Sequence, residues 1–291
     1  MITITQLQIF LKVVEIGNFT KTGKILNMTQ PAISHAVSNL ESELGVKLLI
    51  RDKSKGLMLT NIGEKVLLQV RNLQNSLEII EQEVAAEKGL ETGLIRVGGF
   101  PDFSARFLPK VIQAVHQKYP NITIELYEGS VEEINKWITS RQIDVGFIYS
   151  VHSGLDIIPL LEDQYMAVLP DFHPLLQKSL VSLSDLSGEP LIVGRWGNPK
   201  AIQNLFTESN LAYDQKYTTS NLNTMLGMIA EGLGSSILPE LAVKDTIRWK
   251  NSRPIDTDYR RNIALAVVSL KNVSRATNLF IEIVKEQVKL Q

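Results

Sequence analysis

The stretch TQPAISHAVSNLESELG, residues 29–45, carries the clearest fold signal in the chain. The hydroxyl of Thr29 can cap the free amides of a new helix, and Pro31 falls in the first turn, where a missing N–H costs nothing. Apolar residues then repeat at helical spacing: Ile33, Val37, Leu40 and Leu44. Gly45 is a typical helix end. We therefore predict an amphipathic helix from Thr29 to Gly45.

The outward face of this helix is uncharged, although solvated helix faces usually carry Glu and Lys. It consists of Gln30, Ser34, His35 and Ser38. Short polar side chains near a helix N-terminus can hydrogen-bond base edges and phosphates while the backbone stays close to the groove. The face therefore favours nucleic-acid binding, with an ordinary three-helix bundle as the alternative.

Two further helices are expected upstream of this stretch. Thr5 and Gln8 have the spacing of a capping box. They open an apolar stripe at helical spacing: Leu7, Phe10, Leu11 and Val14. We expect this first helix to end near Gly17.

A second, short helix is expected from about Thr20 to Asn27, with Ile25 and Leu26 turned inward. Two short helices across a tight turn have the spacing of a helix-turn-helix. Four bases follow the third helix: Lys47, Arg51, Lys53 and Lys55. Because residues 57–60 alternate after Gly56, the segment predicts a small β-wing with a basic tip.

Charge is distributed unevenly along the chain. The formal net charge is −1, from 30 Lys and Arg against 31 Asp and Glu, which taken alone argues against a polyanionic partner. Residues 1–60, however, carry seven bases and four acids, a net charge of +3. The near neutrality of the whole chain therefore hides a mildly basic N-terminal part.

Residues 61–90 predict a long helix that ends near Lys88 and Gly89. Its apolar residues follow a heptad pattern: Val66, Val70, Leu73, Leu77, Ile80 and Val84. The stripe is narrow and glutamate-rich flanks border it, which favours pairing of two chains. The alternative is a long helix that lies on its own domain.

From residue 91 onward, short apolar strands alternate with helices, which predicts an α/β fold with a parallel sheet. The first strands are expected at 94–98, 122–126 and 144–148, with helices at 103–118 and 131–140. A second set has strands at 165–169, 190–193, 216–218 and 235–239, with helices at 199–208 and 222–232. A strand at 263–268 and a helix at 274–289 are expected to return to the first set.

Several classes of protein are disfavoured by what the sequence lacks. Zero cysteines exclude disulfides, thiolate metal sites and cysteine nucleophiles. We find no stretch of about 18 apolar residues and no signal-peptide pattern at the start, so we expect a cytoplasmic protein without membrane contact. No catalytic motif occurs and the four histidines are scattered, so we expect no enzyme activity, catalytic residue, cofactor or metal site.

Several segments resemble the winged helix-turn-helix of LysR-type transcriptional regulators: residues 10–20, 29–34, 40–49, Arg51 and residues 59–63. Length and layout also match, so the resemblance covers the whole chain. The paired alanines usual in the family's second helix are Thr22 and Gly23 here, and its aromatic residue after the wing strand is Leu49. Because a mid-helix glycine costs about 1 kcal/mol relative to alanine, we expect Gly23 to weaken that helix.

The resemblance implies an N-terminal winged helix-turn-helix, a long linker (coiled-coil) helix and a two-lobed, periplasmic-binding-protein-like α/β effector domain. The expected divisions are residues 1–60, 61–90 and 91–291, with lobe I at 91–161 plus 268–291 and lobe II at 162–267. The lobes would be joined by chain crossings near 161–163 and 265–268.

The implied function is sequence-specific binding of promoter DNA, modulated by a small-molecule effector between the lobes. The implied assembly is a homodimer that pairs into a homotetramer, with RNA polymerase as a further candidate partner. The alternative is a cytosolic solute-binding or enzymatic α/β protein with a helical N-terminal interaction module.

Carried over residue by residue, the DNA-binding set is Thr20, Thr29, Gln30, Pro31, Ser34, His35, Ser38, Arg51 and Lys53. We assign Gln30 and Ser34 to base edges. Thr20, Thr29 and the wing bases are assigned to phosphates, because phosphate contacts position a protein on DNA whereas base contacts specify the sequence.

Candidate effector residues follow strand ends, where helix N-termini point amides at a ligand. The set is Phe100, Pro101, Asp102, Phe103, Ser130, Arg195, Trp196, Thr219 and Asn221. Arg195 favours a polar or anionic metabolite, but Asp102 would repel an anion, which leaves the effector's charge open. The alternatives are helix capping for Ser130, Asn221 and Asp102, and a surface ion pair for Arg195.

Overall fold

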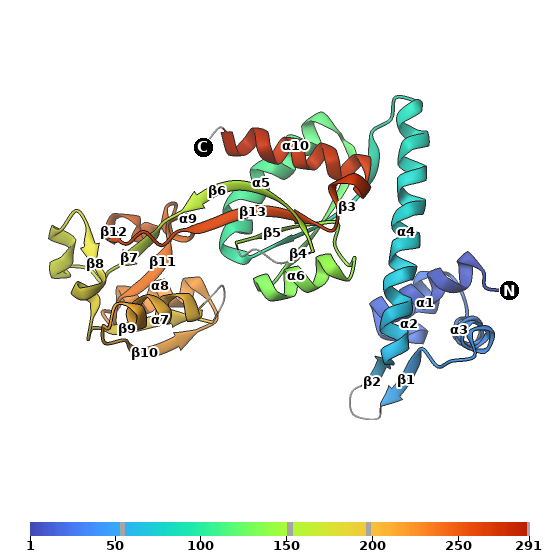
Figure 1. The fold of residues 1–291 in the computed structure, drawn as a ribbon, viewed down its shortest axis with the longest axis horizontal. Coiled ribbons are helices and arrows are strands. Elements are labelled where there is room, and N and C mark those ends of the chain that lie inside the picture. The colour runs from blue at the N-terminus through green and yellow to red at the C-terminus, as the bar shows by residue number, and fades with distance from the viewer. Residues whose placement is uncertain (53–55, 150–153, 196–198, 290–291) are drawn as a thin grey trace. The chain divides into compact units, whose positions relative to one another are not determined.

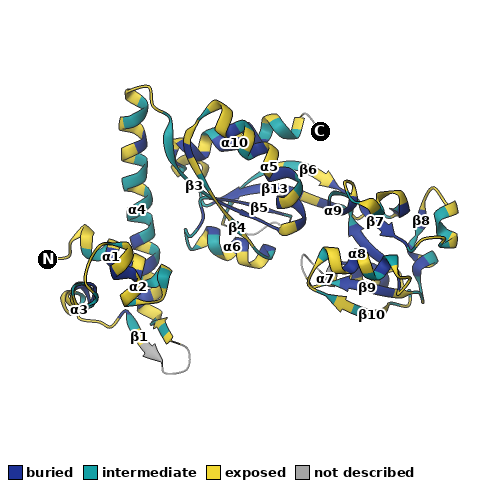
Figure 2. Ribbon diagram, turned by 180° about the vertical axis from the view of Figure 1, so that it is seen from behind, coloured by how far each residue is buried: buried dark blue, intermediate teal, exposed yellow. Residues whose placement is uncertain are grey.

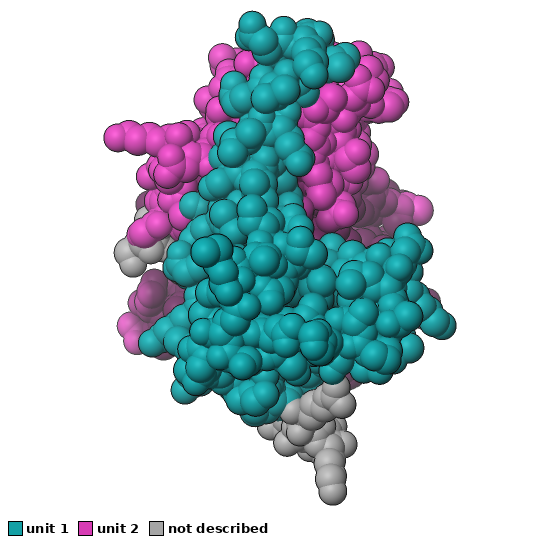
Figure 3. All heavy atoms as spheres, turned by 90° about the vertical axis from the view of Figure 1, so that its right-hand side faces the viewer, with its two compact units in different colours: residues 1–90, 140–142 teal, residues 91–139, 143–291 magenta. Residues whose placement is uncertain are grey.

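The structure is a computed structural model that describes residues 1–52, 56–149, 154–195 and 199–289. The chain divides into two compact units, coloured separately in Figure 3. Unit 1 comprises residues 1–90 with 140–142, and unit 2 comprises residues 91–139 with 143–291. No helix among the described residues is both long and apolar enough to cross a membrane.

Unit 1 contains the three predicted helices, the wing hairpin and the long helix (Figure 1). Their bounds are α1 (Ile4–Ile16), α2 (Phe19–Ile25), α3 (Gln30–Leu44), β1 (Leu49–Asp52), β2 (Gly56–Leu59) and α4 (Asn61–Glu87). Thr29 caps α3, and Gly45 ends it in the left-handed conformation at φ 69°. The antiparallel pairing of β1 with β2 confirms the predicted hairpin, while the basic tip at Lys53 and Lys55 lies outside the described residues.

Two details of the N-terminal helices differ from expectation. The cap of α1 is Thr3 and not Thr5: the Gln6 amide donates to Thr3 Oγ1 at 3.2 Å, and the Thr3 amide donates to Gln6 Oε1 at 2.8 Å. Thr3 and Gln6 have the same capping-box spacing, so the helix begins half a turn earlier. Ile25 is 60% exposed rather than inward, and the buried residues of α2 are Thr22 and Gly23.

Gly23 lies close to the turn that leads from α2 into α3. A Cβ atom at this position would lie 2.6 Å from the Met28 carbonyl oxygen, closer than real Cβ contacts allow. The Met28 amide also donates to the Gly23 carbonyl at 2.8 Å, so the turn into α3 folds back against this residue. The absence of a side chain therefore permits the tight turn between the two helices.

The apolar seam of α4 is divided. Near its start, Val70 is buried and Val66 is half-buried, and both pack with Phe10 and Leu11 of α1. Near its end, Ile80 is 59% exposed and Val84 is 54% exposed. Figure 2 shows exposed and intermediate residues along this end of α4. The first turns of α4 thus belong to the helix-turn-helix core, whereas the last part of the seam faces outward.

Unit 2 begins with a five-stranded sheet of order β4-β3-β5-β13-β6. The elements are β3 (Thr92–Gly99), α5 (Pro101–Lys118), β4 (Asn121–Glu128), α6 (Val131–Thr139), β5 (Val145–Ile148), β6 (Asp156–Asp163), β13 (Arg261–Val267) and α10 (Arg275–Lys289). The expected parallel pairing of β3 with β4 and β5 is confirmed. Strand β13 runs antiparallel to both β5 and β6, so the sheet is mixed.

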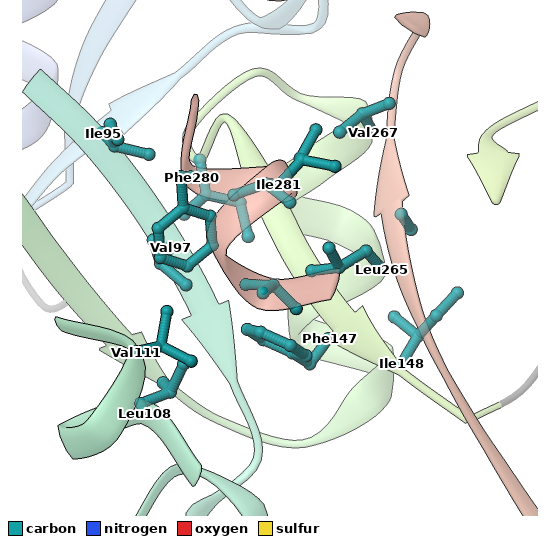
Figure 4. Close-up of a cluster of buried hydrophobic side chains, with 14 of the residues drawn as sticks. Ile95, Val97, Leu108, Val111, Phe147, Ile148, Leu265, Val267, Phe280 and Ile281 are labelled. Carbon is teal, nitrogen blue, oxygen red and sulfur yellow. The ribbon is translucent and has the colours of Figure 1, made fainter. Parts of the chain in front are cut away.

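This first half has its own hydrophobic core (Figure 4). Side chains from β3, α5, β5, β13 and α10 meet there, including Val97, Leu108, Phe147, Leu265 and Phe280. Helix α10 is the last helix of the chain, and its buried face closes a core that starts about 180 residues earlier, at β3. The predicted return of the chain to the first half is therefore confirmed.

The second half contains a four-stranded sheet of order β11-β7-β12-β8 and a parallel pair of β9 and β10. Its elements are β7 (Tyr165–Val168), β8 (Val181–Ser182), β9 (Pro190–Gly194), α7 (Pro199–Glu208), β10 (Asp214–Thr219), α8 (Leu222–Ala230), β11 (Ser236–Pro239), α9 (Glu240–Val243) and β12 (Ser252–Asp256). Short 3-10 helices span Pro174–Gln177, Leu183–Leu186, Ile247–Asn251 and Leu270–Asn272.

The return crossing falls earlier than the predicted 265–268. Strand β13 pairs with first-half strands from Arg261 onward, and Arg261 lies opposite Asp163, the last residue of β6. The chain has therefore already returned at Arg261. Strands β6 and β12 were not predicted. Their sequences, DIIPLLED and SRPID, mix polar and apolar residues without clear alternation.

Candidate functional site

The start of α3 presents the predicted uncharged face. Gln30 and Ser34 are half-buried, while Pro31, His35 and Ser38 are exposed. Thr29 is exposed, and its Oγ1 accepts a hydrogen bond from the Ala32 amide at 3.4 Å, which fixes the first turn of the helix. These side chains follow one another along one helix from its N-terminal end.

Sequence reasoning missed one residue of this face. The side-chain amide of Asn39 lies 3.2 Å from His35 Nδ1, one helical turn further along α3. Its spacing of four residues from His35 is the signal that could have found it. Asn39 extends the polar face by one turn and orients the imidazole.

The remaining DNA-binding candidates lie apart from α3. Thr20 is exposed in the first turn of α2. Arg51 lies in β1 with its backbone opposite Leu57, and Lys53 lies outside the described residues. The structure thus describes the helix-turn-helix part of the candidate interface and the base of the wing.

A cavity of about 540 Å³ opens in unit 2 where three segments approach one another. Its lining residues are Pro101, Asp102, Ala105 and Arg106 from α5, Ser220, Asn221, Leu222 and Asn223 at the start of α8, and Leu241, Ala242, Asp245 and Thr246 in and after α9. Three of the predicted effector residues, Pro101, Asp102 and Asn221, therefore line one cavity.

The other predicted effector residues that the structure describes do not line this cavity. Phe100 and Phe103 are 1% and 0% exposed and belong to the core of the first half. Ser130 caps α6: the Glu133 amide donates to Ser130 Oγ at 3.2 Å, and the Ser130 amide donates to Glu133 Oε2 at 2.8 Å. Helix capping, the alternative considered for Ser130, describes these contacts.

The second-half candidates form local contacts near strand ends. The Arg195 guanidinium donates to Thr218 Oγ1 at 3.3 Å, so its observed partner is a hydroxyl rather than the carboxylate of an ion pair. Thr219 Oγ1 accepts from the Asn221 amide at 3.2 Å, and Asn221 Oδ1 in turn accepts from the Thr224 amide at 3.1 Å. Trp196 lies outside the described residues.

Asp102 takes part in a buried ion cluster that sequence reasoning missed. Arg261, 5% exposed, donates from Nη1 to Asp102 Oδ2 at 2.8 Å and from Nη2 to Asp163 Oδ2 at 2.6 Å. Its guanidinium also lies 4.9 Å from the ring centre of Phe100 and 5.3 Å from that of Tyr149. Capping of α5 by Asp102 was the favoured alternative and is wrong, because its carboxylate turns to Arg261.

The electrostatics of this cluster follow from its burial. Burial alone would lower the pKa of the Arg261 guanidinium, but the carboxylates of Asp102 and Asp163 outweigh it and raise that pKa. For the nearby Tyr165 phenol, burial disfavours the charged form and raises the pKa to about 12, although the charge of Arg261 opposes this shift. Arg261 therefore remains charged and ties β13 to α5 and to the end of β6.

Two family models match this chain, one over its N-terminal part and one over the rest. Residues 4–64 match the bacterial regulatory helix-turn-helix protein, lysR family, and residues 88–289 match the LysR substrate binding domain. The chain belongs to the LysR family. It is a DNA-binding transcriptional regulator with a substrate-binding domain of the LysR type.

Individual relatives agree with this assignment. The LysR-family chain is 44% identical over 286 residues to the uncharacterized HTH-type transcriptional regulator YvbU of Bacillus subtilis, with 98% of each chain covered. A full-length OxyR variant from Pseudomonas aeruginosa shares the fold at a TM-score of 0.80 and 22% identity, over 100% of this chain and 95% of that one. Full-length CbnR complexed with its target DNA gives a TM-score of 0.64 at 24% identity, over 98% and 100%.

Glu41 is a further residue of the LysR-family helix-turn-helix that sequence reasoning missed. Its Oε1 accepts from the amides of Leu48 and Leu49 at 2.9 and 3.1 Å, and Lys47 Nζ lies 2.6 Å from its Oε2. Glu41 follows Val37 by four residues, so its place on the inward helix face was the available signal. Through these hydrogen bonds, the Glu41 carboxylate links the start of β1 to α3.

We expect Glu41→Ala to reduce the protection of the Leu48 and Leu49 amides against hydrogen exchange by roughly 1–2 kcal/mol, because two buried donors lose their acceptor. Burial raises the pKa of Glu41, but the donors from Lys47, Leu49 and Leu48 outweigh it and hold that pKa below its ordinary 4.5.

The stabilisation by Glu41 is therefore present above pH 4.5 and is lost as pH falls through the folded-state pKa. Native-state hydrogen exchange at pH 7 and at pH 4 checks both statements. Glu43→Ala, which changes a more exposed carboxylate on the same helix, is the matched control and should alter neither amide. A difference between wild type and Glu41→Ala that does not shrink on acidification would contradict the assignment.

Proposed function

We propose that this LysR-family regulator reads base edges with Gln30 and Ser34. Pro31, His35 and Ser38 complete the contact surface on the same helix. The observation that supports the assignment is the uncharged N-terminal face of α3 within a winged helix-turn-helix. Short side chains let the helix backbone approach the groove closely.

Phosphate contacts come from residues at the edges of this surface. Thr20 and Thr29 lie at the starts of α2 and α3, and Arg51 lies in β1 of the wing. Lys53 is assigned to phosphates from the sequence alone, since it lies outside the described residues. The similarity to CbnR, whose structure contains its target DNA, supports double-stranded promoter DNA as the partner. The net charge of +3 over residues 1–60 adds a modest attraction to that polyanion.

The protein acts as a homodimer that pairs further into a homotetramer. The exposed end of the α4 seam at Ile80 and Val84 supports chain pairing, because exposed apolar residues at heptad spacing are suited to a partner helix. Two recognition helices at a fixed spacing would bind two half-sites, which compensates for the small charge of each module. RNA polymerase is a further partner at the promoter.

The cavity at the starts of α5 and α8 holds a small-molecule effector that modulates DNA binding. Its lining comes from both halves of unit 2, so an occupant would bias how the halves close on each other. Phe100 and Phe103 support α5 from the core, and Ser130, Arg195 and Thr219 lie at or just after strand ends. Trp196, the remaining candidate, lies outside the described residues. The working divisions are residues 1–60 for DNA, 61–90 for pairing and 91–291 for the effector.

The protein is a cytoplasmic regulator and not an enzyme. Membership of a family of transcriptional regulators supports both statements. The alternative of a solute-binding or enzymatic protein lacks a supporting observation among the described residues.

The assignment of base contacts is tested by Gln30→Ala, with Lys53→Ala for comparison. Gln30→Ala should weaken binding to the cognate operator at least about tenfold and leave random DNA nearly unaffected, because a base contact is lost. Lys53→Ala should weaken both DNAs about equally and reduce the salt slope. Fluorescence anisotropy with the two duplexes at several salt concentrations measures both effects.

The matched control is Gln117→Ala, an exposed glutamine near the end of α5 in unit 2, which should bind both duplexes like wild type. The operator is first located by footprinting the region that flanks the regulator's own gene. Equal losses on operator and random DNA for Gln30→Ala would refute base reading by this residue.

A further inference from the structure

One residue that lines the effector cavity, Asp102, has a buried carboxylate oxygen without a donor among the described residues. Asp102 lines the cavity and is 8% exposed. Its Oδ2 accepts from Arg261 at 2.8 Å, whereas its Oδ1 is buried and has no hydrogen-bond partner among the described residues. A buried acceptor without a donor carries its full desolvation penalty, so this oxygen is a binding position for a donor from outside the protein.

Arg261 already donates hydrogen bonds to two carboxylates, Asp102 and Asp163. Its Nε and Nη2 atoms both donate to Asp163 Oδ2, at 3.1 and 2.6 Å, so two buried carboxylates share one guanidinium. The other cation of the lining, Arg106, has its Nη1 2.8 Å from Asp245 Oδ2, an ion pair without hydrogen-bond geometry. Asp102, Asp163 and Asp245 carry three negative charges against the two positive charges of Arg106 and Arg261, so the ion cluster and the described lining together have a net charge of −1.

The kind of cation that fits follows from the geometry of Asp102. A guanidinium prefers to bind both oxygens of a carboxylate side by side, but Oδ2 of Asp102 is occupied by Arg261. An ammonium group is compact and can donate to a single oxygen. The rest of the lining offers apolar surface from Pro101, Ala105 and Leu222 beside the hydroxyl of Ser220.

We propose that the ligand of this cavity carries a primary ammonium group that donates to Asp102 Oδ1. The proposal rests on the proposed function, because it specifies the chemistry of the effector in the same cavity. A polar or anionic effector was expected from Arg195, which does not line this cavity. Two sources share the ammonium chemistry: aliphatic amines and zwitterionic amino acids.

The test measures thermal shifts of the full-length protein with three groups of probes. Putrescine, ethanolamine and the common amino acids other than proline supply primary ammonium groups. The neutral counterparts are 1,4-butanediol and ethylene glycol, and succinate is an anionic probe. We expect at least one ammonium compound, and no neutral counterpart, to raise Tm. A response to amino acids but not to the two amines would identify a zwitterion as the source.

Site-directed variants then locate the response. Asp102→Asn should weaken the binding of the active compound, measured by calorimetry, at least about tenfold, because a charged hydrogen bond is lost. Ala105→Phe fills the cavity from an exposed position and should abolish the response even where Asp102→Asn folds poorly. The control Asp185→Asn changes a half-buried aspartate that pairs with Lys178 and does not line the cavity, so it should bind like wild type.

Each outcome separates this proposal from the proposed function. A flat response to every ammonium compound, equal binding of neutral counterparts, or full binding by Asp102→Asn overturns the ammonium assignment. A response to succinate alone that Ala105→Phe removes also overturns it, but leaves the cavity as the effector site. Operator binding, measured in parallel by anisotropy, reports on DNA recognition independently of any ligand.

Discussion

Replacement of Arg261 by methionine is expected to lower the free energy of unfolding of unit 2 by about 3–5 kcal/mol. The guanidinium is buried and holds Asp102 and Asp163 at 2.8 and 2.6 Å. Methionine keeps the apolar bulk but removes the charge, so two carboxylates would stay buried without a cation. Removal of one partner from a buried ion cluster is costly because the remaining charges keep their desolvation penalty.

Tryptophan fluorescence isolates this effect. All three tryptophans (Trp137, Trp196 and Trp249) belong to unit 2, so urea unfolding followed by their emission reports on that unit. Arg275→Met is the matched control. Arg275 donates to Glu91 at 2.7 Å but is 43% exposed, so the loss should stay below about 1 kcal/mol. Similar losses for the two variants would contradict the role of Arg261.

The origin of the loss can be tested in the same background. If orphaned carboxylates cause it, Asp102→Asn and Asp163→Asn added to Arg261→Met should restore most of the stability, because neutral amides are far less costly to bury. If the loss persists, it arises from the contacts of the guanidinium with the rings of Phe100 and Tyr149.

The contrast between the two units explains what could be predicted from the sequence. In unit 1 the deciding signals are local: Thr29, Pro31 and Gly45 lie within one helix and its caps, and each acts on amides only a few residues away. The Arg261 cluster joins residues 98 and 159 positions apart, and no local pattern links them. The extent of β13 was mispredicted for the same reason, since its partners are distant in sequence.

The candidate effector site was predicted in part because topology constrains it. Asp102 and Asn221 follow the carboxyl ends of parallel strands in two different sheets, β3 and β10, and both residues line one cavity. The prediction could not distinguish side chains that face the cavity from those that serve the fold. Ser130 caps its own helix, and Phe103 packs in the core. The direction of each side chain depends on the packing around it, which the local sequence does not show.

The junction between the wing and α4 leads to the second large effect, which concerns Gly63. Gly63 is buried in the first turn of α4, and a Cβ atom there would lie 2.2 Å from the Leu48 carbonyl oxygen. That oxygen accepts from the Thr60 amide at 2.9 Å, and Thr60 Oγ1 accepts from the Gly63 amide at 2.9 Å. The methyl group of an alanine at position 63 would therefore have to displace the Leu48 carbonyl. That carbonyl is hydrogen-bonded to Thr60, the cap of α4, and immediately precedes the first wing strand.

We expect Gly63→Ala to destabilise unit 1 by about 3 kcal/mol and to weaken operator binding at least about tenfold, because the wing loses its fixed position beside α3. Hydrogen exchange of the Leu48 and Thr60 amides and operator anisotropy measure the two effects, while the tryptophan unfolding curve should not move. Gly227→Ala is the matched control: Gly227 lies inside α8 with open space around its Cα, so alanine should stabilise unit 2 slightly. Wild-type exchange and operator affinity in Gly63→Ala would refute the close approach of Leu48 to α4.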